Sequence, residues 1–262
     1  MSTAMHVETI DMSRPGIPMS RLVQVELRKL VNTRAGFWLV ISMAIISFLI
    51  MTGILIWGNA ADLTFGGIFG LMNIPTAFLL PVLAILLVTS EWGQRTGLVT
   101  FTLEPRRARI VVAKFITALI AAVGAVLVAL AFGALGTVLA GVFHGGVAGS
   151  WDITTAGLVN AILIQLFGLF MGFAFAMLIM NSAAAIVLYF VLPSIWSVIG
   201  QVVPWLRENV QEWADFGFTQ APLQGGEWAS GKEWAHLAVA GTIWLIIPLL
   251  LGVWRLLRSE VK

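Results

Sequence analysis

One part of the sequence, residues 90–114, gathers charged side chains between two long apolar runs. This charged stretch holds the acidic residues Glu91 and Glu104 and the basic residues Arg95, Arg106, Arg107, Arg109 and Lys114. Guanidinium and ammonium groups bind phosphate and carboxylate oxygens, so the charged stretch is suited to binding anionic groups. Membrane topology together with lipid headgroup contact would also explain the charge, and charge alone does not separate this explanation from a protein partner.

The rest of the sequence offers no pattern typical of catalysis or metal binding. There is no cysteine, and His6, His144 and His236 fall in segments that the predicted topology keeps apart. No nucleophile forms an evident pair with a general base, and the single tyrosine, Tyr189, lies inside an apolar run. The phosphate-loop pattern G-x-x-x-x-G-K-[ST] is absent. We therefore expect no enzyme activity, no metal ion and no cofactor bound by this chain.

The composition predicts an all-α, polytopic membrane protein. Hydrophobic residues make up 59% of the chain and charged residues 11%, against roughly 25% charged in an ordinary soluble domain. A helix needs about 20 apolar residues to cross the hydrocarbon core, and its backbone must be hydrogen-bonded within the segment. Six spans are expected, at about 36–57, 67–90, 110–141, 154–180, 183–203 and 236–257.

The boundary between the fourth and fifth spans is the least obvious. Residues 153–206 contain no Lys, Arg, Asp or Glu, and a single helix of that length would reach about 80 Å. Asn181 and Ser182 are the polar pair nearest the middle, so a tight turn is predicted there.

Six spans with both termini in the cytoplasm give the charge asymmetry that membrane insertion favours. In this arrangement every basic residue except Arg207 and Lys232 falls on the cytoplasmic side. The outer segments hold the acidic residues Asp62, Asp152, Glu208, Glu212, Asp215, Glu227 and Glu233. Five spans would place the C-terminal end outside and spoil the pattern.

Residues 19–34 predict an amphipathic helix that lies on the membrane surface before the first span. Its polar face carries Arg21, Gln24, Arg28 and Asn32, and its apolar face carries Met19, Leu22, Val23, Leu27, Leu30 and Val31. Glu26 lies on the shoulder of the apolar face. It either pairs locally with Lys29 or forms a tie to a basic residue of the charged stretch.

Two further regions could belong to a path for cargo. The outer segment, 204–235, begins with apolar residues at helical spacing, which predicts a short helix at the outer leaflet. This segment is either a plain surface lid or a gate over an exit pathway. Polar residues inside the spans supply candidate pathway residues, namely Asn73, Thr76, Tyr189, Ser194 and Ser197. Helix packing is the alternative explanation for them.

Two segments together resemble the ABC-2 type transporter permeases: VELRKLVNTR before the first span, and SEWGQRTGLVTFTLEPRRARIVVAKF after the second. The family pattern has an acidic residue, a Gly/Thr pair, a Thr-Leu pair, a Pro, an Arg and a Lys. The matching positions are Glu91, Thr96-Gly97, Thr102-Leu103, Pro105, one of Arg106, Arg107 and Arg109, and Lys114. The Ser usual before the Arg is replaced by further arginines. The layout of helices resembles the family over the whole chain.

The resemblance implies an export permease of the bacterial inner (cytoplasmic) membrane. It implies one transmembrane domain over residues 19–257, with cytoplasmic tails at 1–18 and 258–262. Two such subunits, identical or homologous, would form the pathway, and each would dock on a separate ATP-binding subunit that holds ATP and Mg²⁺. The cytoplasmic loop, 91–109, would carry a coupling helix. The implied coupling residues are Glu91, Arg95, Thr96, Gly97, Leu98, Phe101, Glu104, Arg106, Arg107 and Arg109, beside Arg21, Glu26, Arg28 and Lys29 of the amphipathic helix.

The uncharged spans favour an amphipathic, lipid-like, peptide or drug cargo, and no nucleic acid is expected as a partner. The alternative from another class is a membrane carrier that is not driven by ATP, or a structural membrane subunit. Copurification with an ATP-binding protein separates these functions.

Overall fold

The computed structural model describes residues 16–94 and 97–258, and these residues form helices joined by turns and loops, without strands. The helices are α1 (Met19–Asn32), α2 (Arg34–Trp57), α3 (Phe65–Gly93), α4 (Gly97–Leu103), α5 (Arg107–Phe143), α6 (Thr155–Ile179), α7 (Ser182–Val202), α8 (Pro204–Asn209), α9 (Gln211–Ala214), α10 (Phe216–Gln220), α11 (Gly231–Gly241) and α12 (Ile247–Arg258). A 3₁₀ turn follows α10 (Ala221–Gln224), and a π-helical turn joins α11 to α12 (Thr242–Ile246).

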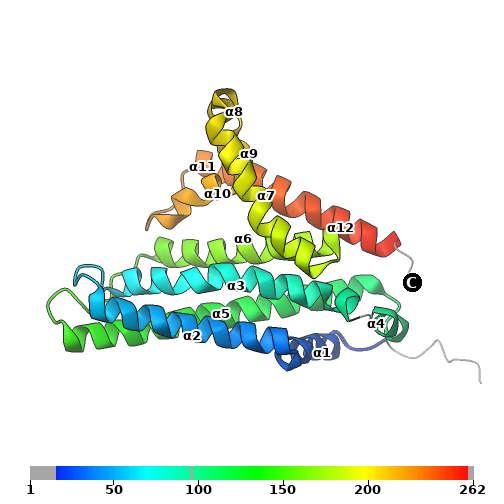
Figure 1. The fold of residues 1–262 in the computed structure, drawn as a ribbon, viewed down its shortest axis with the longest axis horizontal. Helices are drawn as coiled ribbons and strands as arrows, with labels where there is room; N and C mark the ends of the chain where they lie inside the picture. The colour runs from blue at the N-terminus through cyan, green and yellow to red at the C-terminus, as the bar shows by residue number, and fades with distance from the viewer. Residues whose placement is uncertain (1–15, 95–96, 259–262) are drawn as a thin grey trace, which may run out of the picture.

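Six helices in the described residues are long and apolar enough to cross a membrane, as predicted. They are α2, α3, α5, α6, α7 and the continuous helix from α11 to α12. Figure 1 shows that α2, α3, α5 and α6 run alongside one another, with α7, α11 and α12 on the far side of α6. The central helix is α3, which packs against α2, α5 and α6.

The turn between α6 and α7 falls at the polar pair in the long uncharged region. Met180 adopts a left-handed backbone with φ of 56°, and Asn181 accepts a hydrogen bond from the Ala184 amide at 3.0 Å. This side-chain acceptor satisfies one of the free N–H groups at the start of α7. From there α7 leans away from the other helices (Figure 1), and only Ala185 and Gly200 of α7 are buried.

Small residues allow the helices around α6 to approach closely. A Cβ on Gly172 of α6 would lie 2.7 Å from the Pro81 carbonyl oxygen of α3. A Cβ on Gly252 of α12 would lie 2.6 Å from the backbone of Met177 and Leu178. Because these neighbours are backbone atoms, they cannot move aside as a flexible side chain would.

The π-helical turn lies in the middle of the last long helix. Trp244 and Leu245 in this turn are buried, and the Trp244 indole donates a hydrogen bond to the Ala214 carbonyl at 2.7 Å. Pro248 follows after Ile247 and has no N–H to continue an α-helical ladder. A wider turn at this point is therefore a local solution to the broken ladder, and π turns of this kind are single interruptions of α-helices.

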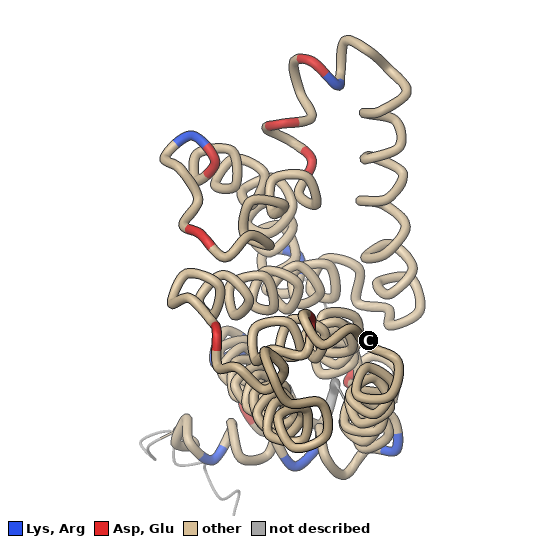
Figure 2. The backbone as a smooth tube through the Cα atoms, turned by 90° about the vertical axis from the view of Figure 1, so that its left-hand side faces the viewer, with Lys and Arg blue, Asp and Glu red and all other residues tan. Residues whose placement is uncertain are grey.

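The two ends of the helix bundle differ in charge. The basic end holds α1, α4, the start of α5 and the end of α12 (Figure 1). The opposite end, formed by the α2–α3 and α5–α6 loops with Asp62 and Asp152, faces the viewer in Figure 2, and the outer segment, whose charged residues are mainly acidic, lies at the top of that view. Sequence reasoning predicted one short helix at the start of the outer segment. The structure has three, α8, α9 and α10, and the last of them begins after Asp215, whose side chain accepts from the Phe218 amide at 3.0 Å.

Candidate functional site

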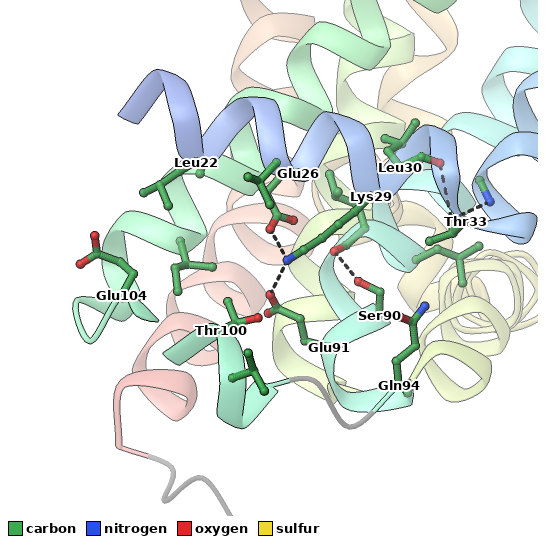
Figure 3. A pocket seen from close by; sticks show the side chains of 18 of the residues that line it. Leu22, Glu26, Lys29, Leu30, Thr33, Ser90, Glu91, Gln94, Thr100 and Glu104 are labelled. Atoms are coloured by element: carbon green, nitrogen blue, oxygen red, sulfur yellow. Dashed lines mark hydrogen bonds and ion pairs between the residues drawn. The ribbon is translucent and has the colours of Figure 1, made fainter. Parts of the chain in front are cut away.

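Four charged residues from three helices meet at the basic end, and we call them the four-charge cluster. They are Glu26 and Lys29 of α1, Glu91 of α3 and Lys114 of α5. Lys114 Nζ lies 2.6 Å from Glu26 and 3.5 Å from Glu91. Lys29 Nζ lies 2.7 Å from Glu26 and 3.3 Å from Glu91. Figure 3 shows both carboxylates turned toward the Lys29 ammonium.

Helical spacing explains why α1 contributes a buried acid. Val23, Glu26 and Leu30 are the buried residues of α1, and intervals of three and four residues place them on one face. That face packs against α5, so Glu26 lies beside Lys114 instead of water. Both contacts offered as alternatives for Glu26 therefore occur, since it pairs with Lys29 and with Lys114 of the charged stretch.

The cluster differs from a surface ion pair in its burial. Side-chain exposure is 3% for Lys114, 5% for Glu26 and 1% for Glu91, and only Lys29, at 34%, reaches solvent. Lys114 also donates to the Leu87 carbonyl of α3 at 2.9 Å. Two acids and two bases make the cluster neutral as a unit, which lowers the cost of burying its members.

The pKa values of the α1 residues follow from this arrangement. Burial alone would raise the pKa of Glu26, but the Lys114 and Lys29 ammonium groups outweigh it, and the pKa is lowered. Burial alone would lower the pKa of Lys29, but Glu26 and Glu91 outweigh it, and the pKa is raised. Both shifts favour the charged forms.

A second group of contacts joins the arginines at the start of α5, Arg106, Arg107 and Arg109, to the rest of the chain. Arg109 lies 2.8 Å from Glu104 and also donates to the Ile17 carbonyl. Arg107 donates to the Leu256 carbonyl of α12 at 2.7 Å. Arg106 has an exposed side chain, although its backbone amide donates to Glu104 at 3.3 Å. Of the three arginines, Arg106 is thus the one whose side chain points away from the chain.

Other residues predicted for coupling surround these contacts. Arg21 and Arg28 are exposed on α1. The predicted coupling segment contains α4, where Gly97 is the first residue. Predictions for Arg95 and Thr96, and for the side chains of Leu98 and Phe101, lie outside what the structure describes.

A cavity of about 560 Å³ lies between α1, α3, α4 and the start of α5. Figure 3 looks into it. Three members of the four-charge cluster, Glu26, Lys29 and Glu91, line its wall. Sequence reasoning did not foresee this cavity, because its wall comes from segments far apart in the chain.

The candidate pathway residues are not brought together in one site. Gln165 of α6 donates to the Asn73 carbonyl and side-chain oxygens, both at 3.0 Å, and to the Thr76 hydroxyl of α3. Tyr189 packs on α6, where its hydroxyl oxygen would lie 3.3 Å from a Cβ on Gly168. These contacts favour helix packing over a pathway wall.

The two serines of α7 complete this set. Ser194 is exposed and donates to the Phe190 carbonyl of its own helix at 2.7 Å, and Ser197 is half-buried. Gln165 and Lys114 were missing from the residues predicted for a site. Gln165 could have been found as an amide side chain near the middle of the fourth span, and Lys114 as the cation nearest the apolar run of the third span.

No group of three or more potential metal ligands occurs within the described part of the chain. The site combines a neutral buried ion cluster with a partly apolar cavity, an arrangement suited to binding and positioning. No protein-family model matches this chain, and the comparison with curated proteins finds no match either.

Proposed function

We propose that the chain is the transmembrane permease subunit of an ATP-driven exporter of the ABC-2 type. In this proposal the basic end faces the cytoplasm, two permease subunits form the pathway, and separate ATP-binding subunits dock on α4 and its surroundings. The charge difference between the two ends supports the orientation, since basic residues near spans favour the cytoplasmic side.

The observation that carries the proposal is the link between α4 and the spans. The short helix α4 lies between α3 and α5 at the basic end. Glu91 of α3 and Lys114 of α5 are tied to α1 through the four-charge cluster. The helix α4 packs against α3, and Glu104, the residue after α4, pairs with Arg109 of α5. A push on α4 would therefore reach α3 and α5 directly and α1 through the four-charge cluster, and such a tied group of helices suits the transmission of force from an ATPase.

A copurification experiment tests this function. The tagged chain is isolated from its native membranes in mild detergent, and bound proteins are identified and assayed for ATP hydrolysis. We expect an ATP-binding protein to copurify and its ATPase activity to change when the chain is added back. If no ATP-binding protein copurifies and no partner activity changes, the chain is a carrier of another kind or a structural subunit.

A charge reversal narrows the test to the docking surface. Arg106→Glu changes an exposed side chain and leaves the contacts of Arg107 and Arg109 in place. We expect it to weaken ATPase docking while membrane insertion stays normal. Arg207→Glu, an exposed arginine of α8 at the opposite end, is the matched control. If the two variants dock equally well, Arg106 does not contact the ATPase, and its charge serves the orientation of the chain in the membrane.

A further inference from the structure

The cavity at the basic end has the size and lining of a ligand site. Its volume of about 560 Å³ lies within the roughly 300–1,000 Å³ typical of ligand pockets. Much of its wall is apolar and comes from Leu22, Val25 and Leu30 of α1 and Leu83, Leu86 and Leu87 of α3. A mostly apolar wall with a few charged groups is the usual make-up of such sites.

One charged group in this wall has an unused acceptor. Glu91 lines the cavity and is buried. Its Oε1 atom faces the two lysines, but the described residues bring no hydrogen-bond donor to Oε2. An unsatisfied buried carboxylate oxygen is costly. The cavity is therefore suited to a molecule that donates an N–H group to Glu91.

Positive charge lies beside this acceptor. Lys29 lines the cavity, is 34% exposed, and uses its ammonium for Glu26 and Glu91. An ammonium has three donors, so one remains for a further acceptor. Arg21 also lines the cavity from the exposed side of α1. A phosphate beside Lys29 would meet a cation while a neighbouring N–H group meets Glu91.

Apolar side chains at the border of the cavity are open to the surroundings. Val25 is 44% exposed, Val99 60% and Leu103 69%, and all three line the cavity. Exposed apolar residues next to an amphipathic helix suit contact with acyl chains. A ligand that enters here thus has a charged head with both signs and an apolar tail.

We propose that this cavity binds the headgroup of a phosphatidylethanolamine-type lipid. The primary ammonium donates to Glu91 Oε2, the phosphate accepts from Lys29, and the acyl chains lie along Val25, Val99 and Leu103. A trimethylammonium head carries no N–H group, so phosphatidylcholine cannot make the bond to Glu91. This inference goes beyond the proposed function and needs no ATPase partner.

Lipid retention by the purified full-length chain tests the proposal. Native mass spectrometry in detergent would compare phosphatidylethanolamine, its N-methylated forms and phosphatidylcholine with the same acyl chains. We expect retention to fall with each added methyl group and to be about tenfold lower for phosphatidylcholine, the size of effect that loss of a hydrogen bond to a charged group gives. Equal retention of the two lipids by the wild-type chain would overturn the proposal.

Two variants identify the site. Glu91→Gln should remove most of the preference for phosphatidylethanolamine, whereas Glu208→Gln, which changes an exposed carboxylate of α8, should keep it. Thr100→Trp fills the cavity from α4 and leaves all four charges of the cluster in place. It should lower retention of phosphatidylethanolamine about tenfold. If the Thr100→Trp chain prefers this lipid as strongly as the wild type does, the site is not in the cavity. This test holds even where Glu91→Gln fails to fold.

Discussion

Replacing Lys114 by methionine tests whether burial gives the four-charge cluster its strength. The change keeps an unbranched side chain but removes an ammonium that lies 2.6 Å from Glu26 and 3.5 Å from Glu91. Lys114 is 3% exposed, so water cannot replace the lost charge. Removing one partner of a buried pair costs about 3–5 kcal/mol. Because Lys29 still lies 2.7 Å from Glu26, we expect a loss of about 3 kcal/mol, at the lower end of that range.

Lys29→Met is the matched control for this experiment. It is the same substitution beside the same two carboxylates, but Lys29 is 34% exposed. Solvent screens the ammonium that is lost, although Glu26 and Glu91 stay buried and keep Lys114 as a partner. We therefore expect Lys29→Met to lower the free energy of unfolding by clearly less than the loss of about 3 kcal/mol expected for Lys114→Met.

Equilibrium unfolding of the purified chain in mixed detergent micelles, followed by circular dichroism, measures both losses. The double variant Glu26→Gln with Lys114→Met should lose less than the sum of its single variants, because it removes an acid and a base together. If Lys114→Met costs no more than Lys29→Met, the argument from burial is wrong.

Three further predictions concern packing, hydrogen bonding and pH. Gly172→Ala should lower the free energy of unfolding by about 1–3 kcal/mol, because the new methyl meets backbone atoms of α3. Gly124→Ala, with open space around it, should be neutral or stabilising, and similar losses of stability in the two variants would contradict the close approach of α6 to α3. Gln165→Leu should cost about 0.6 kcal/mol, the average for hydrogen bonds between membrane helices, and transport should survive if these residues only pack, so loss of transport at normal stability would support a pathway. Because the pKa of Glu26 is lowered, its contribution to the free energy of unfolding is present above the pKa it has in the unfolded chain and is lost as pH falls below about 4. Because the pKa of Lys29 is raised, its contribution is present below the pKa it has in the unfolded chain and is lost as pH rises above about 10. Unfolding midpoints measured across pH should therefore fall less steeply in acid for Glu26→Gln than for the wild type, and an equal fall would assign the acid sensitivity to other groups.

The long helices of this fold were predictable because each depends on local sequence. Runs of apolar residues between charged segments predicted six long helices, and length alone required a break in the uncharged region. Asn181 marked that break because its side chain can cap a helix that starts there. The outer segment was less predictable, since Asp215 divides it through a cap that composition does not reveal.

The site was predictable only in part because its members come from distant segments. Sequence reasoning placed Glu26 beside either Lys29 or the charged stretch, but a helical wheel does not show that one carboxylate can reach both. The grouping of Glu91 with Lys114 depends on how α3 packs against α5. Burial turns these residues from surface charges into a cluster, and burial is a property of the fold.

The π-helical turn between α11 and α12 has a consequence for how sequences of this fold should be aligned. A π-helical turn closes its hydrogen bonds over five residues where an α-helix uses four, so it takes up one extra residue without turning the helices on either side. Deleting one residue from Thr242–Ile246 would therefore let the helix return to an α-helical ladder while Gly252 still faces the backbone of α6 that it contacts. A gap of one residue in the middle of this apolar helix, which would normally be read as an alignment error, is thus compatible with two chains whose α11 and α12 face the same neighbours.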